Sequence, residues 1–148
     1  MSYTSLNYHI VFSTKTRKPF FTEEEIQAVS RYIGVILKNR KGCLFLGNGI
    51  SNHIHLLCSL HPESSLSEIV RAVKANSSRW IHETYPHLAT FDWQDGYSAF
   101  SVSYSGLEKV SHYIRVQQEH HKKMTFEEEL LLLLKKHKIP VKPEYVFG

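Results

Sequence analysis

The sequence predicts an α+β fold: a ferredoxin-like sandwich in which a mostly antiparallel sheet carries helices on one face. Three observations lead to this prediction. Short apolar, β-rich segments alternate with longer segments whose apolar residues recur at helical spacing. Several S/T-x-x-E boxes mark the starts of helices. The turn-rich stretch GNGISN joins two strands in the middle of the chain into a hairpin.

The first half of the chain is expected to run strand, helix, strand, strand. Residues 8–13 (YHIVFS) are apolar and β-rich, which predicts the first strand. Thr22 and Glu25 form a capping box for the helix that follows. Residues 44–46 and 53–60 are the two strands of the central hairpin.

The second half is expected to contain one strand and three helices. The alternating stretch 96–104 predicts the strand, and a helix is expected over residues 105–123. Five leucines at 130–134 are apolar all round, which predicts a last helix buried on more than one side. Each helix starts with a capping box, at Ser65 and Glu68, Ser105 and Glu108, and Thr125 and Glu128.

Length and composition restrict the class of protein. The 148 residues suit a single domain, expected over residues 1–148. Two cysteines exclude a disulfide framework and a cysteine-rich zinc cage, and they fit a reducing cytoplasm. No apolar run approaches the roughly 20 residues that span a bilayer, and no secretory signal is visible. A net charge of +4 permits a polyanionic partner. We therefore expect a cytoplasmic protein with no membrane partner.

The segment NHIHLL carries the first candidate site. Side chains alternate along a strand, so His53 and His55 are expected on the same face. Two imidazoles at this spacing can bind one metal ion, while Ile54 and Leu56 face the core. The alternative is an exposed polar strand face with two solvated histidines.

The segment YIRVQQEHH carries the second candidate site. Tyr113 and Gln117 are four residues apart and share a helical face, and His120 continues the same stripe. Together with Glu119 and His121, these residues offer oxygen and nitrogen ligands. The alternative is a tyrosine that anchors the edge of the core with its hydroxyl in water.

Five segments taken in order resemble one family over nearly the whole chain: NYHIVFSTKTRKPFF, NHIHLL, VKANSSRWI, WQDGYSAFSVS and YIRVQQEHH. They resemble the HUH single-tyrosine transposases of the simplest bacterial insertion sequences, the IS-two-hundred-like transposases. The resemblance implies that Tyr113 is the nucleophile. It also implies that His53, His55 and Gln117 bind the metal ion.

The resemblance also implies an activity and its partners. The expected protein cleaves and rejoins single-stranded DNA through a 5′-phosphotyrosine, using Mg²⁺ or Mn²⁺, and recognises hairpins at the element ends. It is expected to be a homodimer with a mobile C-terminal helical part, approximately residues 106–138. His120 is a candidate base that assists Tyr113. Candidate DNA contacts are Arg71, Lys74, Arg79, Lys15, Arg17 and Lys18, although a basic stripe on one helix alone is more typical of a solvated face.

Two other functions fit parts of the sequence. One is a domesticated protein that binds or processes hairpin DNA at dispersed palindromic repeats. The other is a metal-dependent phosphohydrolase of small molecules, which would keep its activity in a Tyr113→Phe variant.

Overall fold

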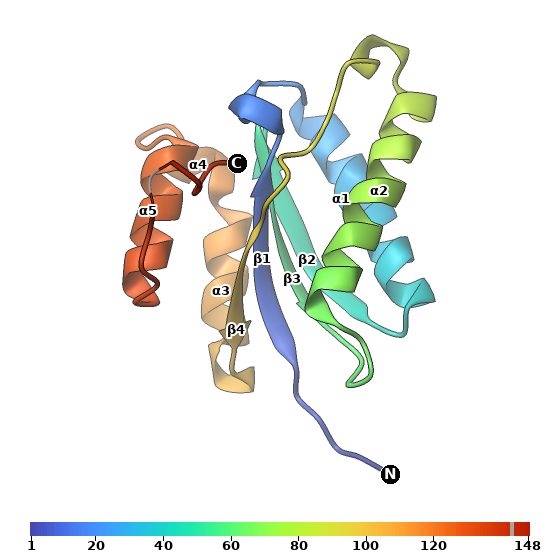
Figure 1. Cartoon of the computed structure of the whole chain (residues 1–148), viewed down its shortest axis with the longest axis vertical. Helices are drawn as coiled ribbons and strands as arrows, with labels where there is room; N and C mark the ends of the chain where they lie inside the picture. Colours follow the sequence, from blue (N-terminus) through green and yellow to red (C-terminus); the bar gives the residue numbers. More distant parts are fainter. Residues whose placement is uncertain (143) are drawn as a thin grey trace.

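A computed structural model of the chain describes residues 1–142 and 144–148 and has the predicted α+β architecture (Figure 1). Its four-stranded antiparallel sheet has the strand order β2-β3-β1-β4. This order and the βαββαβ succession are those of a ferredoxin-like sandwich. The elements are β1 (Asn7–Ser13), η1 (Lys15–Arg17), α1 (Glu23–Asn39), β2 (Cys43–Ile50), β3 (His53–Ser59), α2 (Leu66–Thr84), η2 (Pro86–Leu88), β4 (Ser98–Val102), η3 (Tyr104–Gly106), α3 (Leu107–Arg115), α4 (Gln117–His120) and α5 (Phe126–Lys136).

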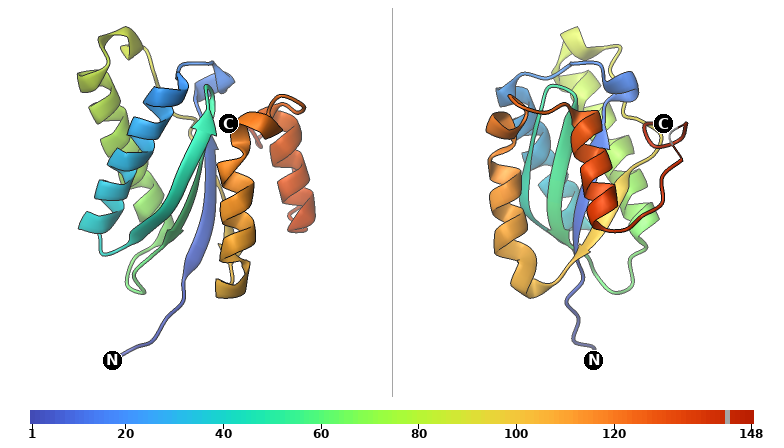
Figure 2. Two further views of the ribbon diagram at one scale, coloured as in Figure 1. Left: turned by 180° about the vertical axis from the view of Figure 1, so that it is seen from behind. Right: turned by 90° about the vertical axis from the view of Figure 1, so that its left-hand side faces the viewer.

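Helices cover both faces of the sheet. α1 and α2 form the expected layer on one face, and α3, α4 and α5 lie on the other (Figure 2). Strand alternation divides the side chains between the two layers. Ile54, Leu56 and Cys58 of β3 join the large core beneath α1 and α2. A smaller apolar cluster, made by Val11, Phe100, Phe126, Leu130 and Leu134, holds α5 against the opposite face.

The strand β2 is longer than predicted. It continues through Gly47 and Gly49, which the sequence analysis placed in a turn, so only two residues separate it from β3. A Cβ at Gly49 would lie 2.1 Å from the carbonyl oxygen of His53. Gly49 therefore serves to let two paired strands approach closely, and it does not form a turn.

Two of the predicted capping boxes are complete, and one is wrong. In the boxes of Thr22 and Thr125, both reciprocal hydrogen bonds are present. The Ser65 side chain accepts only from the backbone N–H of Glu68. Ser105 caps no helix, because it lies within η3 and its hydroxyl bonds to that of Ser103.

The helix predicted over residues 105–123 is broken at Val116, whose φ and ψ are −98° and 21°. The break is supported by Asn48 of β2, whose side-chain amide donates to the carbonyl oxygen of Ile114 at 2.9 Å. The buried Asn48 amide thus donates the hydrogen bond that a backbone N–H would give to this carbonyl oxygen in an unbroken helix. The result is two helices, α3 and α4, where the sequence pattern predicted one.

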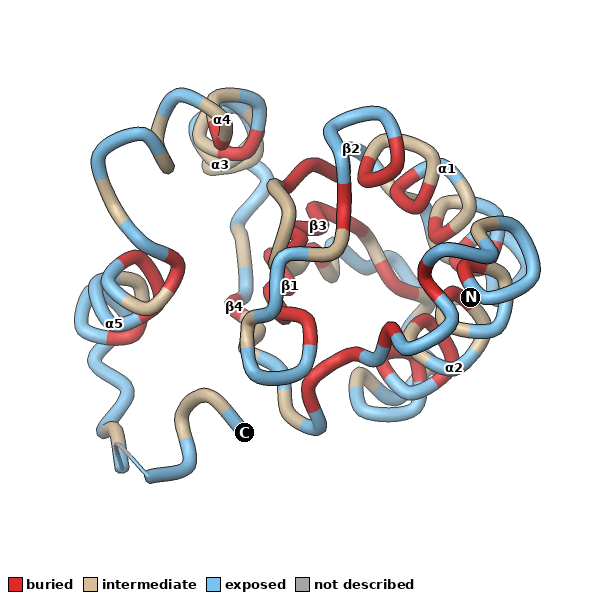
Figure 3. Tube along the Cα trace, turned by 90° about the horizontal axis from the view of Figure 1, so that it is seen from above, coloured by how far each residue is buried: buried red, intermediate tan, exposed pale blue. Residues whose placement is uncertain are grey.

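The leucine run is buried on one side only, contrary to the prediction. Leu130 and Leu134 are buried, whereas Leu131 and Leu132 are 43% and 53% exposed. Figure 3 shows the buried residues of α5 on the side that faces the sheet. α5 has one surface to cover, so only one stripe of the run is used. Across the described part of the chain, no helix is long and apolar enough to cross a membrane.

Candidate metal and tyrosine site

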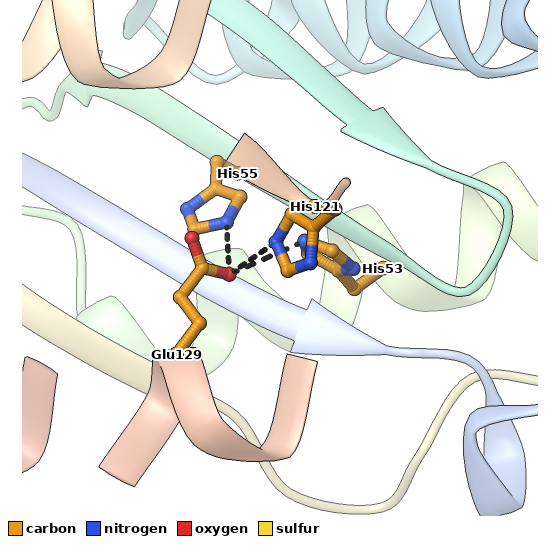
Figure 4. Close-up of side chains that lie close together, drawn as sticks. All are labelled: His53, His55, His121 and Glu129. Carbon is orange, nitrogen blue, oxygen red and sulfur yellow. Dashed lines mark hydrogen bonds and ion pairs between the residues drawn. The ribbon is translucent and has the colours of Figure 1, made fainter. Parts of the chain in front are cut away.

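His53 and His55 point from β3 toward the layer formed by α3, α4 and α5 (Figure 4). This is the shared face predicted from strand alternation. Both side chains have no solvent exposure, so the alternative of an exposed polar strand is wrong. Buried imidazoles require polar partners, and the surroundings supply them.

Each of these two histidines is oriented by a partner at its Nδ1 atom. His53 Nδ1 donates to Asn52 Oδ1 at 2.9 Å. His55 Nδ1 lies 2.8 Å from Nε2 of His9, which is buried on β1. These contacts turn both Nε2 atoms toward a common point between the sheet and α5. Histidines that bind metal ions are typically held in this way by their second nitrogen.

The carboxylate of Glu129 occupies that common point. Its Oε1 atom lies 2.9 Å from Nε2 of His121, 3.1 Å from Nε2 of His55 and 3.4 Å from Nε2 of His53 (Figure 4). Burial alone would raise the pKa of Glu129, but the surrounding imidazoles, first of all the hydrogen bond with His121, outweigh burial and hold the pKa far below its ordinary value. Glu129 is therefore a buried carboxylate ion.

Tyr113 and Gln117 meet the same carboxylate in spite of the helix break between them. The Tyr113 hydroxyl and Gln117 Nε2 both donate to Glu129 Oε2, the latter at 2.9 Å. Gln117 Oε1 lies 3.1 Å from His53 Nε2. Burial, and then the charge of Glu129, raise the pKa of Tyr113 above its ordinary value. The tyrosine is thus a neutral phenol in this arrangement.

The donor set fits a divalent cation. One nitrogen or oxygen atom from each of His53, His55, His121 and Glu129 lies within 4.8 Å of the others. Burial lowers the pKa of His53 to about 4, so its ring is neutral at neutral pH. Because Nδ1 donates to Asn52, the Nε2 lone pair points at the oxygens of Gln117 and Glu129. A cation bound between these atoms would accept electron density from all of them and so relieve the repulsion between their lone pairs.

Comparison with known families decides the protein class. A family model described as "Transposase IS200 like" matches residues 2–117. The chain belongs to this family. The transposases for insertion sequence element IS200 of Salmonella typhimurium strain LT2 and Salmonella typhi are each 28% identical over 117 residues, which cover 76% of this chain and 76% of the relative. The ISDra2 transposase TnpA of Deinococcus radiodurans is 24% identical over 119 residues, 77% of this chain and 85% of its own.

Solved structures share the fold of this IS200-like transposase. A candidate transposase from Deinococcus radiodurans R1 superposes with a TM-score of 0.64 at 23% identity, covering 79% of this chain and 95% of its own. A REP-associated tyrosine transposase bound to a REP hairpin gives a TM-score of 0.60 at 15% identity, covering 82% and 74%. The α+β fold predicted from the sequence is therefore confirmed.

The remaining predicted residues of the transposase lie in different places. His120 lies beside Tyr113, with ring centroids 5.4 Å apart, and its Nε2 is 3.5 Å from Glu129 Oε2. Among the described residues, this buried Nε2 has no hydrogen-bond partner. Its assignment as an assisting base stays a prediction.

Of the predicted DNA contacts, those on α2 lie across the sheet from Tyr113. Arg71 and Arg79 are exposed there. The Lys74 ammonium donates to the carbonyl oxygens of Gln94, Asp95 and Gly96, which ties α2 to the segment before β4. Burial lowers the pKa of Lys74 to about 8. Lys74 therefore has a structural role that the helical stripe did not indicate.

A second basic group lies at the end of the sheet where β3 begins. Lys15, Arg17 and Lys18 follow β1, and Ser13 pairs with His53. The Arg17 guanidinium donates to the carbonyl oxygen of Phe147 at 2.7 Å. A groove beside this group is lined by Arg17, Asn52, His121, Lys122 and Lys123, among others. The last two residues were not predicted as DNA contacts.

The sequence analysis missed Glu129 and His9. Glu129 belongs to the acidic first turn of α5, where carboxylates are typical without any site. What could have indicated a role in the sequence is its position directly before the leucine run, which places Glu129 among the buried residues of α5 with Leu130. His9 interrupts the apolar run of β1, and a histidine in such a strand indicates a buried polar partner. His121 had been named as a potential ligand, without a role.

A cleft of about 410 Å³ leads from the surface to this site. Phe100, Val110 and Leu133 line its walls, and Tyr113, His9 and Glu129 also border it. The tyrosine hydroxyl is therefore reached between β4, α3 and α5. A nucleotide strand lying in the cleft would have apolar surface for its bases on the way to Tyr113.

Proposed function

We propose that this IS200-like transposase cleaves and rejoins single-stranded DNA through a covalent 5′-phosphotyrosine on Tyr113, with His53, His55 and Gln117 holding a divalent ion. One observation carries the proposal. The tyrosine hydroxyl and the two imidazoles converge on a single buried carboxylate, at the end of a cleft open to the surface.

The proposed step exchanges one phosphodiester bond for another. Tyr113 Oη attacks the phosphorus, and the bond from phosphorus to the 3′ oxygen breaks. The phosphoryl group stays on the tyrosine as a 5′-phosphotyrosine, and the phenolic proton ends on the released 3′-OH. The reverse attack by a 3′-OH rejoins DNA, so the cycle needs no external energy source.

The chain's own groups position the reactants for this step. Glu129 accepts from Tyr113 and fixes the direction of Oη. Because the resting tyrosine is a neutral phenol, its proton must leave during the attack. Glu129, which accepts from the hydroxyl, and His120, whose ring lies beside that of Tyr113, are the proposed acceptors. Asn52 and His9 fix the rings of His53 and His55.

The proposed cofactor is Mg²⁺ or Mn²⁺. When bound, a divalent ion polarises the scissile phosphate and offsets the charge that develops on it. His53 and His55 present their Nε2 atoms to it, and Gln117 presents its amide oxygen.

The proposed substrate is a single strand that carries a hairpin. The structural neighbour bound to a REP hairpin supports hairpin recognition by a similar fold. An unpaired strand spares the cost of melting a duplex at the site. Homodimer formation and movement of residues 106–138 stay predictions for this chain.

A covalent adduct assay tests the proposal. The protein is mixed with single-stranded DNA from the flanks of its own gene and with Mn²⁺ or Mg²⁺, and the products are run on a denaturing gel. We expect a metal-dependent, SDS-resistant adduct that is absent from Tyr113→Phe and from His53→Ala/His55→Ala. Tyr104→Phe, an exposed tyrosine before α3, is the matched control and should form the adduct normally.

Each other outcome has a definite meaning. An adduct in Tyr113→Phe identifies a different nucleophile and contradicts the proposal. Tight hairpin binding by the wild type with no adduct, over a panel of flanking sequences, favours a hairpin-binding protein at dispersed palindromic repeats. Phosphohydrolase activity that survives in Tyr113→Phe favours an enzyme of small molecules.

A further inference from the structure

We infer that His121 and Glu129, from the segment that follows the family-matched region, are ligands of the same ion as His53 and His55, and that the ion fastens α5 to the sheet. The inference rests on the ion of the proposed function but adds two ligands to it. Both residues lie beyond residue 117, where the match to the family model ends.

The geometry of the four residues supports shared coordination. His121 Nε2 is 2.9 Å from Glu129 Oε1, which also contacts His55 Nε2 at 3.1 Å. Its side chain is 3% exposed and that of Glu129 is 1% exposed. Both side chains are thus almost completely buried beside the two histidines of β3.

The hydrogen-bond pattern around His121 points the same way. Among the described residues, its Nδ1 atom has no partner and is buried. Its Nε2 atom contacts the carboxylate of Glu129 at 2.9 Å. A buried imidazole aimed by one nitrogen at a cluster of ligand atoms is better explained as part of that cluster than as a surface histidine.

The chemistry of the set predicts which ions it prefers. Three imidazole nitrogens are borderline ligands and the carboxylate oxygen is a hard one, a combination that suits Mn²⁺, Co²⁺ and Zn²⁺. Mg²⁺ prefers oxygen ligands and retained water. Glu129 also supplies a negative charge that the predicted set of His53, His55 and Gln117 lacks. We therefore expect the site with these two added ligands to bind Mn²⁺ more tightly than Mg²⁺.

A shared ion would connect parts of the fold that are far apart in the sequence. His53 and His55 belong to β3, His121 follows α4, and Glu129 lies in the first turn of α5. Besides the ion, α5 is held by the small apolar cluster that contains Leu130 and Leu134. Ion binding should therefore reduce local opening of α5 more than that of α1.

Calorimetric titration of the full chain with MnCl₂ tests the ligands. We expect His121→Ala and Glu129→Gln each to weaken Mn²⁺ binding by at least about tenfold, the smallest loss usual even for residues that only orient a ligand. Glu127→Gln is the matched control, because it removes a carboxylate of the same helical turn that is not one of the four grouped ligand residues, and should bind as the wild type does. Circular dichroism of each metal-free variant shows whether it is folded.

Hydrogen exchange gives a second readout that does not depend on activity. Mn²⁺ should slow exchange of the α5 amides in the wild type and in Glu127→Gln, but not in His121→Ala. His121→Ala also keeps the test open if Glu129→Gln does not fold.

The outcomes separate this inference from the proposed function. Wild-type Mn²⁺ affinity in His121→Ala and Glu129→Gln, with binding lost in His53→Ala, overturns the inference and leaves the proposed function standing. Absence of Mn²⁺ binding to the wild type overturns the inference and the proposed metal dependence together. The role of Tyr113 is then still decided by the adduct assay.

Discussion

At the scale of single residues, Asn48 shows how one buried side chain shapes the site. Its amide nitrogen donates to the carbonyl oxygen of Ile114, and its oxygen accepts from Gln27 and Gln118. These bonds hold the break that separates Tyr113 from Gln117. Without the break, the two residues would follow a regular helical spacing and Gln117 would lie elsewhere relative to β3.

Asn48→Ala is therefore expected to destabilise the protein and disturb the site. Loss of the buried partner leaves the Ile114 carbonyl unsatisfied, which costs about 1–3 kcal/mol. Urea denaturation measures the free energy of unfolding, and the adduct assay should show a lower yield. Asn39→Ala, at the exposed end of α1, is the control and should change stability by less than about 0.5 kcal/mol. Equal stability of the two variants would contradict this role for Asn48.

Separation along the sequence distinguishes the site residues that could be predicted from those that could not. His53 and His55 share a face because of strand alternation, a local property that two residues determine. His9 reaches His55 across 46 residues and Glu129 reaches it across 74. Those contacts depend on the register of β1 with β3 and on how α5 packs. A local sequence pattern specifies neither.

At the scale of elements, the cap of α1 couples stability to pH. Burial alone would raise the pKa of Glu25, but the backbone N–H of Thr22 and the imidazole of His87 outweigh burial and lower the pKa from its ordinary 4.5. A carboxylate with a lowered pKa stabilises the fold above its unfolded pKa. This contribution is lost as the pH falls below 4.5 and through the folded pKa.

Glu25→Gln should therefore make the free energy of unfolding depend less steeply on pH in the acid range. We expect the variant to lose about 1 kcal/mol of stability at neutral pH, as for other caps, and less as the pH falls. Urea denaturation at a series of pH values, compared with the wild type and with Glu23→Gln in the same turn, measures this difference. An unchanged acid slope in Glu25→Gln would show that the capping carboxylate is not the group that titrates.

The helix α5 illustrates how tertiary packing overrides a sequence pattern. Its leucine run is apolar all round, but only the stripe with Leu130 and Leu134 meets the sheet. Leu130→Ala should lower the free energy of unfolding by about 2–4 kcal/mol, because it leaves a cavity under α5. Leu131→Ala, on the exposed side, should change it by less than about 0.5 kcal/mol. Thermal or urea unfolding of the two variants measures the contrast, and equal losses would contradict the one-sided packing.

At the scale of the whole molecule, the distribution of basic residues relative to Tyr113 predicts where the DNA backbone runs. The sheet separates Arg71 and Arg79 on α2 from the site, whereas Lys122 and Lys123 line the groove next to His121. The contact of Lys122 with Glu119 is exposed, and Lys123 is itself exposed, so both lysines can be removed with little loss of stability.

Lys122→Ala/Lys123→Ala should therefore lower the affinity for single-stranded DNA. It should also make that affinity less sensitive to salt concentration. Loss of two phosphate contacts reduces the slope of log K against log[NaCl] by about 1.4 for a single strand. Fluorescence anisotropy of a labelled strand, measured in a Tyr113→Phe background to prevent cleavage, gives the slope. Lys38→Ala/Arg40→Ala removes the same charge from the end of α1, on the other layer, and should leave the slope nearly unchanged. If Arg71→Ala/Arg79→Ala lowers the slope and the Lys122 and Lys123 variant does not, the backbone crosses the α2 layer, as the sequence stripe predicted.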